Sequence, residues 1–217
     1  MESRKNDSKR STASSSSDQS SDSTDPRQAL SELATRHCAL KTEDALCYFL
    51  KIHLCIYDKI DSSRFTQMAQ LNPIFANKCI DVCTAFLENR SFKDRPSAWL
   101  EAFGSYMDEP CPITLTLALM AKAHIMCDLP VALYELEVKT GIAVDEDQYE
   151  GVYLLIVECM NQMDADLKSN GMLIDEIALQ ISKNLHLPRN FHIWRLRAKA
   201  WEAYKLLRRI ERGRGKR

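Results

Sequence analysis

The stretch ITLTLALMAKAHIMCDLPVALYELEV, residues 113–138, decides the fold that the sequence predicts. It is apolar on nearly every side of a helix, so we expect it to form the central, most buried helix. Gly141 is the expected stop, because glycine readily adopts the left-handed conformation that ends many helices. Asp145 then begins the next helix as its N-cap, with Gln148 three residues later in a capping box.

Helical periodicity also dominates the sequence on both sides of this stretch. Apolar residues recur every three or four positions in residues 43–60, and His53 falls on their buried face. Asn72 and Pro73 predict the start of another helix, since proline suits the first helical turn. The last long helix follows Pro188 and is expected to bury Phe191, Trp194, Ala198 and Trp201. With strand-like alternation missing, the sequence predicts an all-α fold, a single orthogonal bundle of about seven or eight helices around one buried central helix.

The chain divides into one folded domain and two tails. Residues 1–26 consist mainly of Ser, Asp, Lys and Arg and have almost nothing apolar to bury, so we expect disorder there. Residues 27–207 form the expected all-α domain. Residues 208–217 are a basic tail, interpreted as a solvated helix end, with a nuclear-type signal or a phosphate-binding patch as alternatives. A protein partner that binds through either tail remains open.

Composition and charge indicate an ordinary soluble protein. The 217 residues are 45% hydrophobic and 27% charged, with a net charge of -1, which predicts no general attraction to nucleic acid or anionic membrane. No apolar run approaches the ~20 residues of a membrane span. The N-terminus lacks the apolar segment of a secretory signal. We therefore expect a cytoplasmic protein with no membrane span and no specific nucleic-acid partner.

The eight cysteines are expected to be free thiols. They are scattered among apolar helix positions, and no CxxC pair occurs, so neither a disulfide framework nor a structural zinc site is predicted. Cys79 and Cys83, for example, fall on the apolar stripe of one predicted helix. Buried free thiols in a reducing compartment account for this pattern.

His124 and Asp128 interrupt the apolar central stretch. Residues four apart share one helical face, with about ~6 Å between their Cβ atoms, and a carboxylate on an apolar face is costly unless it is paired. Pro130 lacks an N–H and leaves the carbonyl of Met126 without its helical partner, which favours a kink. Two interpretations stay open. Either the pair forms a polar pocket for chemistry, or Asp128 only holds the tautomer of a core histidine.

Three other residues are candidates to join this pair. Arg197 lies on the predicted buried face of the last helix and needs an anion, for which Asp128 or Asp81 would serve. His53 is expected to point inward. A divalent metal is an open alternative as cofactor, because His124, Asp128 and His53 would supply three ligands. No HExxH or aspartate-rich motif supports that alternative.

Five segments carry a resemblance to a known family. NPIFANKCIDVCTAF, RPSAWLEAF, LMAKAHIMCDLPVAL, DEDQYEGVYLLI and RAKAW resemble, in order and spacing, a mostly bacterial family of unknown function, the domain of unknown function numbered 5995. The resemblance covers about residues 43–207, and its most specific part is the Ala-His-Ile segment followed by Asp-Leu. The family pattern has asparagines where this chain has Lys122 and Met126. The resemblance implies a single all-α domain and no particular reaction.

These observations lead to two functional hypotheses. The first is an enzyme that acts on a lipophilic small molecule as an isomerase, cyclase, lyase or hydrolase. His124 would be its general acid/base, Asp128 would orient His124, and Arg197 or His53 would stabilise developing negative charge. The second is a non-catalytic helical module that binds a small molecule or a partner helix. In that module the same residues form a structural polar network.

Overall fold

The computed structural model describes residues 25–40, 44–60, 64–88, 94–107, 111, 113–159, 162 and 193–214. All regular structure in these ranges is helical, which confirms the predicted all-α bundle. The helices are α1 (Pro26–Leu40), α2 (Ala45–Lys59), α3 (Thr66–Leu87), α4 (Ser97–Met107), α5 (Ile113–Ala123), the π-helix η1 (His124–Asp128), α6 (Leu129–Thr140), α7 (Glu146–Gly151) and α10 (Ile193–Arg214). Of the predicted disordered tail, residues 1–26, residues 1–24 lie outside the described residues, and α1 begins at Pro26.

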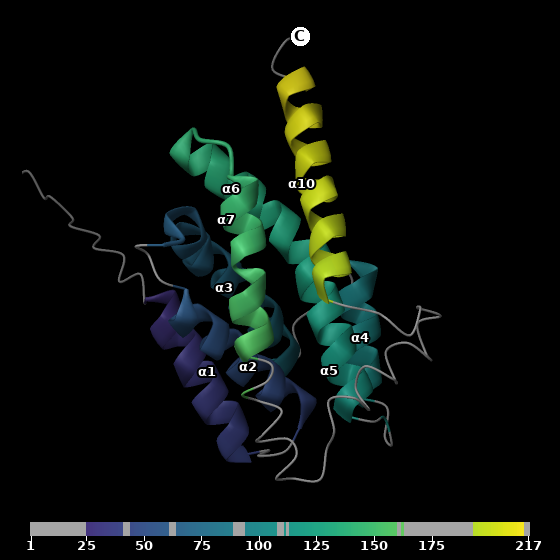
Figure 1. The fold of residues 1–217 in the computed structure, drawn as a ribbon. Helices are drawn as coiled ribbons and strands as arrows, with labels where there is room; N and C mark the ends of the chain where they lie inside the picture. The colour runs from purple at the N-terminus through teal and green to yellow at the C-terminus, as the bar shows by residue number, and fades with distance from the viewer. Residues whose placement is uncertain are drawn as a thin grey trace, which may run out of the picture.

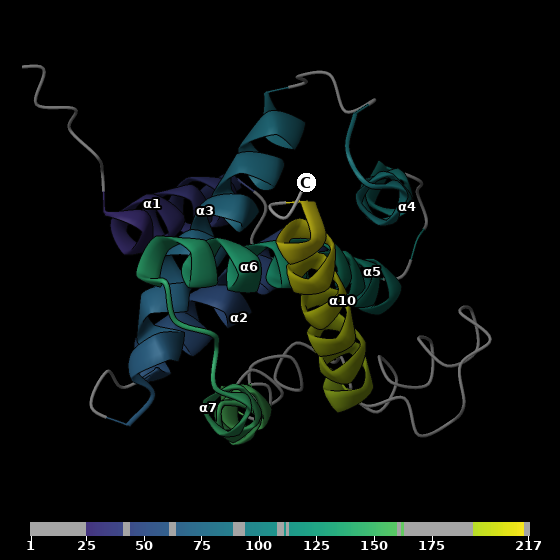
Figure 2. The same cartoon turned by 90° about the horizontal axis from the view of Figure 1, so that it is seen from above.

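The central element is one continuous helical run made of α5, η1 and α6. Figure 2 shows α5 and α6 in line through the middle of the molecule, with α10 crossing the run. Helices α2 and α4 pack on α5, whereas α3 and α10 pack on both η1 and α6 (Figure 1). Residues 113–138 therefore form the central helix that the sequence predicts.

Two hydrophobic clusters lie along this central run. The first joins α1, α2, α4 and α5 to the C-terminal half of α3, and includes Leu46, Leu50 and Trp99. The second joins α6 and α10 to the N-terminal half of α3 and to residues 144–152, and includes Leu133 and Trp201. The π-helix η1 follows α5 and precedes α6, so it lies where one cluster gives way to the other.

Three predicted helix features differ from the structure. Helix α3 begins at Thr66, so Pro73 lies inside it. Helices tolerate an internal proline at a cost, and the turns before Pro73 bury Met68 and Leu71 in the second cluster. Trp194 is 45% exposed rather than buried, and its ring lies beside the guanidinium of Arg195. Helix α10 continues to Arg214, past the predicted end of the domain at residue 207.

The cap of α7 links that helix to α3. The Asp145 carboxylate accepts a hydrogen bond from the backbone N–H of Gln148 at 2.9 Å, which confirms the predicted N-cap. The return bond of a capping box is made by another residue. The side-chain oxygen of Gln67 accepts a hydrogen bond from the backbone N–H of Asp145 at 2.6 Å. The backbone N–H of Gln67 donates to the side-chain oxygen of Gln148. The cap therefore also fixes the position of α7 against α3.

A disulfide joins Cys38 of α1 to Cys47 of α2. The prediction that all eight cysteines are free is therefore wrong for these two. Helices α1 and α2 pack together and place the two Cα atoms 5.3 Å apart, within the range that a disulfide requires. The free cysteines of the described chain are Cys55, Cys79, Cys83, Cys111, Cys127 and Cys159.

Within the residues that the structure describes, one helical segment, Leu115–Thr140, is long and apolar enough to cross a membrane by length and composition alone. It is the central run of the fold, and 56% of its most apolar window is buried inside the protein. A core helix passes the same test, so this segment is weak evidence for a membrane span. The expectations of a cytoplasmic location and of no membrane span stay predictions.

Gly141 ends α6 in the left-handed conformation, with φ of +70°. Replacing Gly141 by alanine should lower the free energy of unfolding by about 1–2 kcal/mol, because a Cβ atom is strained at this φ. Gly104 provides a matched control, since it lies in the exposed interior of α4 with open space around it. Gly104→Ala should be stabilising by about 0.5–1 kcal/mol. Urea denaturation of both variants tests this, and equal effects would contradict it.

Candidate functional site

The site begins with the π-helical turn that carries His124 and Asp128. Leu129, the residue before Pro130, donates its backbone N–H to the carbonyl of His124, five residues earlier. Pro130 has no N–H for the regular helical ladder, so the irregularity predicted at this point takes the form of a π-turn. Single π-turns inside α-helices are frequent at functional sites.

His124 and Asp128 are joined by a hydrogen bond of 2.8 Å between Nδ1 and Oδ2. The indole N–H of Trp99 donates to both carboxylate oxygens of Asp128, at 3.2 and 3.3 Å. Asp128 thus accepts a hydrogen bond from Trp99 of α4. A carboxylate only accepts, so we assign the proton in the bond between Asp128 and His124 to Nδ1 of His124. In a neutral imidazole this tautomer leaves a lone pair on Nε2.

The Nε2 atom of His124 is buried and has no hydrogen-bond partner among the residues that the structure describes. His124 as a whole is 3% exposed. The ring of Phe75 stacks on it with centroids 3.8 Å apart, and the ring of Phe49 meets it edge-on at 5.7 Å. A buried acceptor without a hydrogen-bond partner lowers the stability of the fold by about 1–3 kcal/mol. The Nε2 atom is therefore an unfavourable feature of the site when nothing is bound there.

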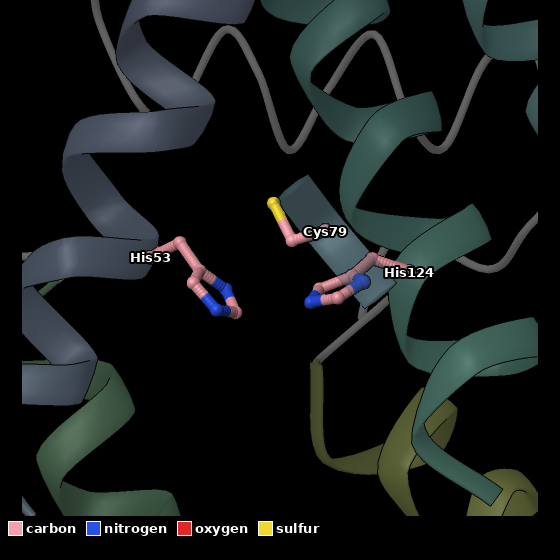
Figure 3. Close-up of side chains that lie close together, drawn as sticks. All are labelled: His53, Cys79 and His124. Carbon is pink, nitrogen blue, oxygen red and sulfur yellow. The ribbon is translucent and has the colours of Figure 1, made fainter. Parts of the chain in front are cut away.

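Two further side chains from other helices approach His124. The ring of His53, on α2, lies 4.9 Å from the His124 ring, centroid to centroid. Cys79, on α3, completes a group whose ligand atoms all lie within 4.8 Å of one another. Figure 3 shows the three side chains close together on three different elements, with the Cys79 sulfur directed away from the two imidazole rings. Burial, together with the proximity of His124, lowers the pKa of His53 well below 6.5. Hydrogen bonding with Cys83 and burial raise the pKa of Cys79 well above 9.0.

Sequence reasoning identified part of this group. His124, Asp128 and His53 were candidates, and the structure brings them together. Cys79 was interpreted only as a core residue, because its helical stripe contains other apolar residues. The sequence does place Cys79 four residues after Phe75, and therefore on the same helical face. That spacing says nothing about which residues of other helices Cys79 would meet. As a metal-ligand candidate, Asp128 is already occupied by His124 and Trp99.

Arg197 has different partners from those predicted. It is buried on α10, where its guanidinium donates to the carbonyl of Tyr149 and lies over the Tyr149 ring at 4.2 Å. The predicted partners are engaged elsewhere, since Asp81 pairs with Arg95 at 2.7 Å and Asp128 binds His124 and Trp99. The expectation that a carboxylate at residue 128 or 81 pairs with Arg197 is therefore wrong. The carbonyl and the π face of Tyr149 solvate the cation instead.

A surface hollow of about 320 Å³ lies near the C-terminal end of α10. It is lined by Arg209, Ile210, Gly213 and Arg214, none of which belongs to the His124 group. The His53, Cys79 and His124 side chains are all buried. The candidate site is therefore an interior cluster and this hollow is not its entrance.

Comparison with models of known protein families finds a match for this chain. A family model described as "Family of unknown function (DUF5995)" matches residues 27–216, which covers the helices α1 to α10 of the structure. Neither a curated protein nor a solved structure matches the chain. The match confirms the resemblance noted in the sequence and supplies no activity.

Proposed function

The chain belongs to the DUF5995 family of unknown function, and from its site we propose that it is an enzyme that acts on a small lipophilic molecule. His124 is the proposed general acid/base, and Asp128 orients it. The aromatic side chains Phe49, Phe75 and Trp99 around the imidazole favour an apolar substrate over a sugar or a nucleotide. Isomerisation, cyclisation, elimination and hydrolysis all fit this arrangement of groups.

The observation that carries the proposal is the unpartnered Nε2 of His124. A histidine that served only to hold helices together would gain stability by pairing both ring nitrogens. Here one nitrogen is fixed by Asp128 and the other is left with a free lone pair, which is the arrangement that a general base requires. The Trp99 N–H in turn fixes the carboxylate that orients the base.

We do not propose Arg197 as the group that stabilises developing negative charge, although the sequence predicted that role. Its guanidinium faces Tyr149, and among the described residues no contact with the His124 group supports a direct part in charge stabilisation. His53, whose ring lies 4.9 Å from that of His124, is the better placed of the two candidates. We therefore propose His53 as the second group beside the reacting molecule, next to His124.

The burial of His124 favours the second candidate function, a non-catalytic binding or interaction module. With the imidazole 3% exposed and Phe75 stacked on it, a substrate reaches Nε2 only when an aromatic side chain moves aside. In this alternative the His124–Asp128–Trp99 chain is a polar network that fixes α4 against the central run. The two functions differ in whether Nε2 removes a proton from an apolar molecule.

Base-catalysed ring opening of 5-nitrobenzisoxazole tests this difference. The reaction needs only a base. The base takes the ring C–H proton, the N–O bond breaks, and a coloured phenolate nitrile forms. The metal-free wild-type chain should open the ring about 10²-fold or more faster than His124→Gln, a typical contribution of a general base. Asp128→Asn should lose about 10-fold, because the wrong tautomer of His124 becomes accessible.

His37→Gln is the matched control. His37 is also buried and also pairs with an aspartate, since its Nε2 lies 2.9 Å from Asp44, but it belongs to the contact between α1 and α2. This variant should retain the wild-type rate. A wild-type rate no higher than that of His124→Gln, or an equal loss in His37→Gln, would reject the enzyme proposal and leave the binding module. Circular dichroism confirms that each variant is folded.

A further inference from the structure

We infer that His53, Cys79 and His124 form a binding site for one zinc ion. The three side chains come from α2, α3 and η1, all three are buried, and their ligand atoms lie within 4.8 Å of one another (Figure 3). The inference goes beyond the proposed function. An ion bound at Nε2 would occupy the lone pair that serves as the general base in the metal-free chain, so the two proposals are tested separately.

The chemistry of the donor set selects the metal. Two imidazoles and one thiol are the ligands that Zn²⁺ prefers, whereas Mg²⁺ and Ca²⁺ require oxygen ligands. The carboxylate of Asp128, which is bonded to His124, has its two oxygens engaged by His124 and Trp99. Three protein ligands leave a fourth position open, which is the coordination pattern of catalytic zinc sites.

The geometry needs an adjustment of the side chains before the three ligand atoms reach zinc distances. With Zn–N distances of about 2.0–2.1 Å and a Zn–S distance of about 2.3 Å, the ligand atoms of a tetrahedral site lie roughly 3.3–3.6 Å apart. A pair at the 4.8 Å limit must therefore close by roughly 1.2–1.5 Å. Figure 3 shows a ring nitrogen of His124 directed toward His53, with Cys79 between the two helices that carry them. Closure therefore requires the Cys79 side chain to turn its sulfur toward the two imidazole rings.

The unpartnered Nε2 of His124 is the second, independent observation. It is a buried acceptor with no hydrogen-bond partner in the described chain, and a metal ion would supply the missing partner. Its other ring nitrogen is bound to Asp128, which reproduces the carboxylate–histidine–metal arrangement that orients histidine ligands in metal sites. Trp99 then holds the carboxylate in place.

Charge balance also supports a dication in this interior. When zinc displaces the thiol proton of Cys79, the site contains the Zn²⁺ ion, one thiolate and the Asp128 carboxylate, and these charges sum to zero. A neutral set is needed because an uncompensated charge is very costly in the protein interior. The released proton leaves to solvent, so zinc binding should weaken as the pH falls.

The test is a titration of the full-length, chelator-treated protein with Co²⁺ and then Zn²⁺. Cobalt in a tetrahedral site with a thiolate ligand gives visible and near-ultraviolet absorption bands that zinc removes on displacement. The expected result is one equivalent of metal per chain and a higher melting temperature with zinc. Cys79→Ser, His53→Gln and His124→Gln should each lose the absorption bands. Asp128→Asn should keep them with about 10–100-fold weaker affinity, because it changes only the orientation of His124.

His37→Gln and Cys127→Ser are the matched controls. The first removes a buried histidine and the second a partly buried thiol next to Asp128, and neither residue belongs to the cluster. Both should bind cobalt as the wild type does. The inference is overturned if the wild type takes up no stoichiometric metal, or if Cys79→Ser retains the wild-type spectrum. Metal binding without ring-opening activity counts only against the proposed function, and ring opening without metal binding counts only against the zinc site.

Discussion

Replacing Trp99 by alanine should lower the free energy of unfolding by about 3–5 kcal/mol, the usual cost of deleting a large aromatic side chain from a core. Trp99 is 1% exposed. Its indole stacks on Phe103 with centroids 5.5 Å apart, meets Phe49 edge-on, and donates to Asp128. The substitution therefore removes core packing and also leaves the Asp128 carboxylate without one of its two donors. Urea denaturation monitored by circular dichroism measures the loss.

Two variants separate the contributions to this effect. Trp99→Phe keeps most of the volume and removes the N–H that donates to Asp128, so it should cost about 1–2 kcal/mol. Trp194→Ala removes a tryptophan that is 45% exposed, and should change the free energy of unfolding by less than about 1 kcal/mol. If Trp194→Ala were as destabilising as Trp99→Ala, the assignment of these two residues to surface and core would be wrong.

Glu137→Ala should be the second most destabilising change, with a loss of about 2–4 kcal/mol. Glu137 is on α6, and its side chain is 12% exposed. It accepts hydrogen bonds from the hydroxyl of Tyr204 at 2.7 Å, from Arg208 at 2.8 Å and from Arg212 at 3.1 Å, all on α10. Removing the carboxylate takes away the partner of three donors and loosens the contact between α6 and α10.

The pKa of Glu137 predicts how the stability of the fold depends on pH. Burial by itself would raise the pKa of Glu137, but the hydrogen bonds from Tyr204 and Arg208 outweigh burial and hold this pKa below its ordinary value of 4.5. The unfolded chain then binds more protons than the folded one, so stability rises with pH. The contribution of Glu137 is complete above pH 4.5 and is lost as the pH falls through the lower pKa of the folded state.

Comparison of wild type with Glu137→Gln isolates this contribution. Glutamine retains the size of the side chain and cannot ionise, so the stability difference between the two proteins should be largest near neutral pH and should shrink below pH 4.5. Unfolding by urea at several pH values measures it. A difference that stayed constant on acidification would show that the carboxylate charge contributes nothing to the contact of α6 with α10.

Features within one or two helical turns follow directly from the sequence pattern. The apolar run predicts the central helix, Gly141 predicts its end, and Asp145 predicts the next N-cap. The spacing of His124 and Asp128 predicts that they share one face, and the structure places them in hydrogen-bonding contact. These features depend on helical periodicity and on backbone preferences, which a single stretch of chain contains in full.

Contacts between helices depend on how the helices dock, and the pattern within any one helix leaves that open. The meeting of His53 with Cys79, the disulfide between Cys38 and Cys47, and the pairing of Arg197 with Tyr149 all join residues of different helices. The sequence predicts a buried face for a helix without specifying which face it meets. Crossing angles and packing in three dimensions decide that, because many side chains must fit together at once.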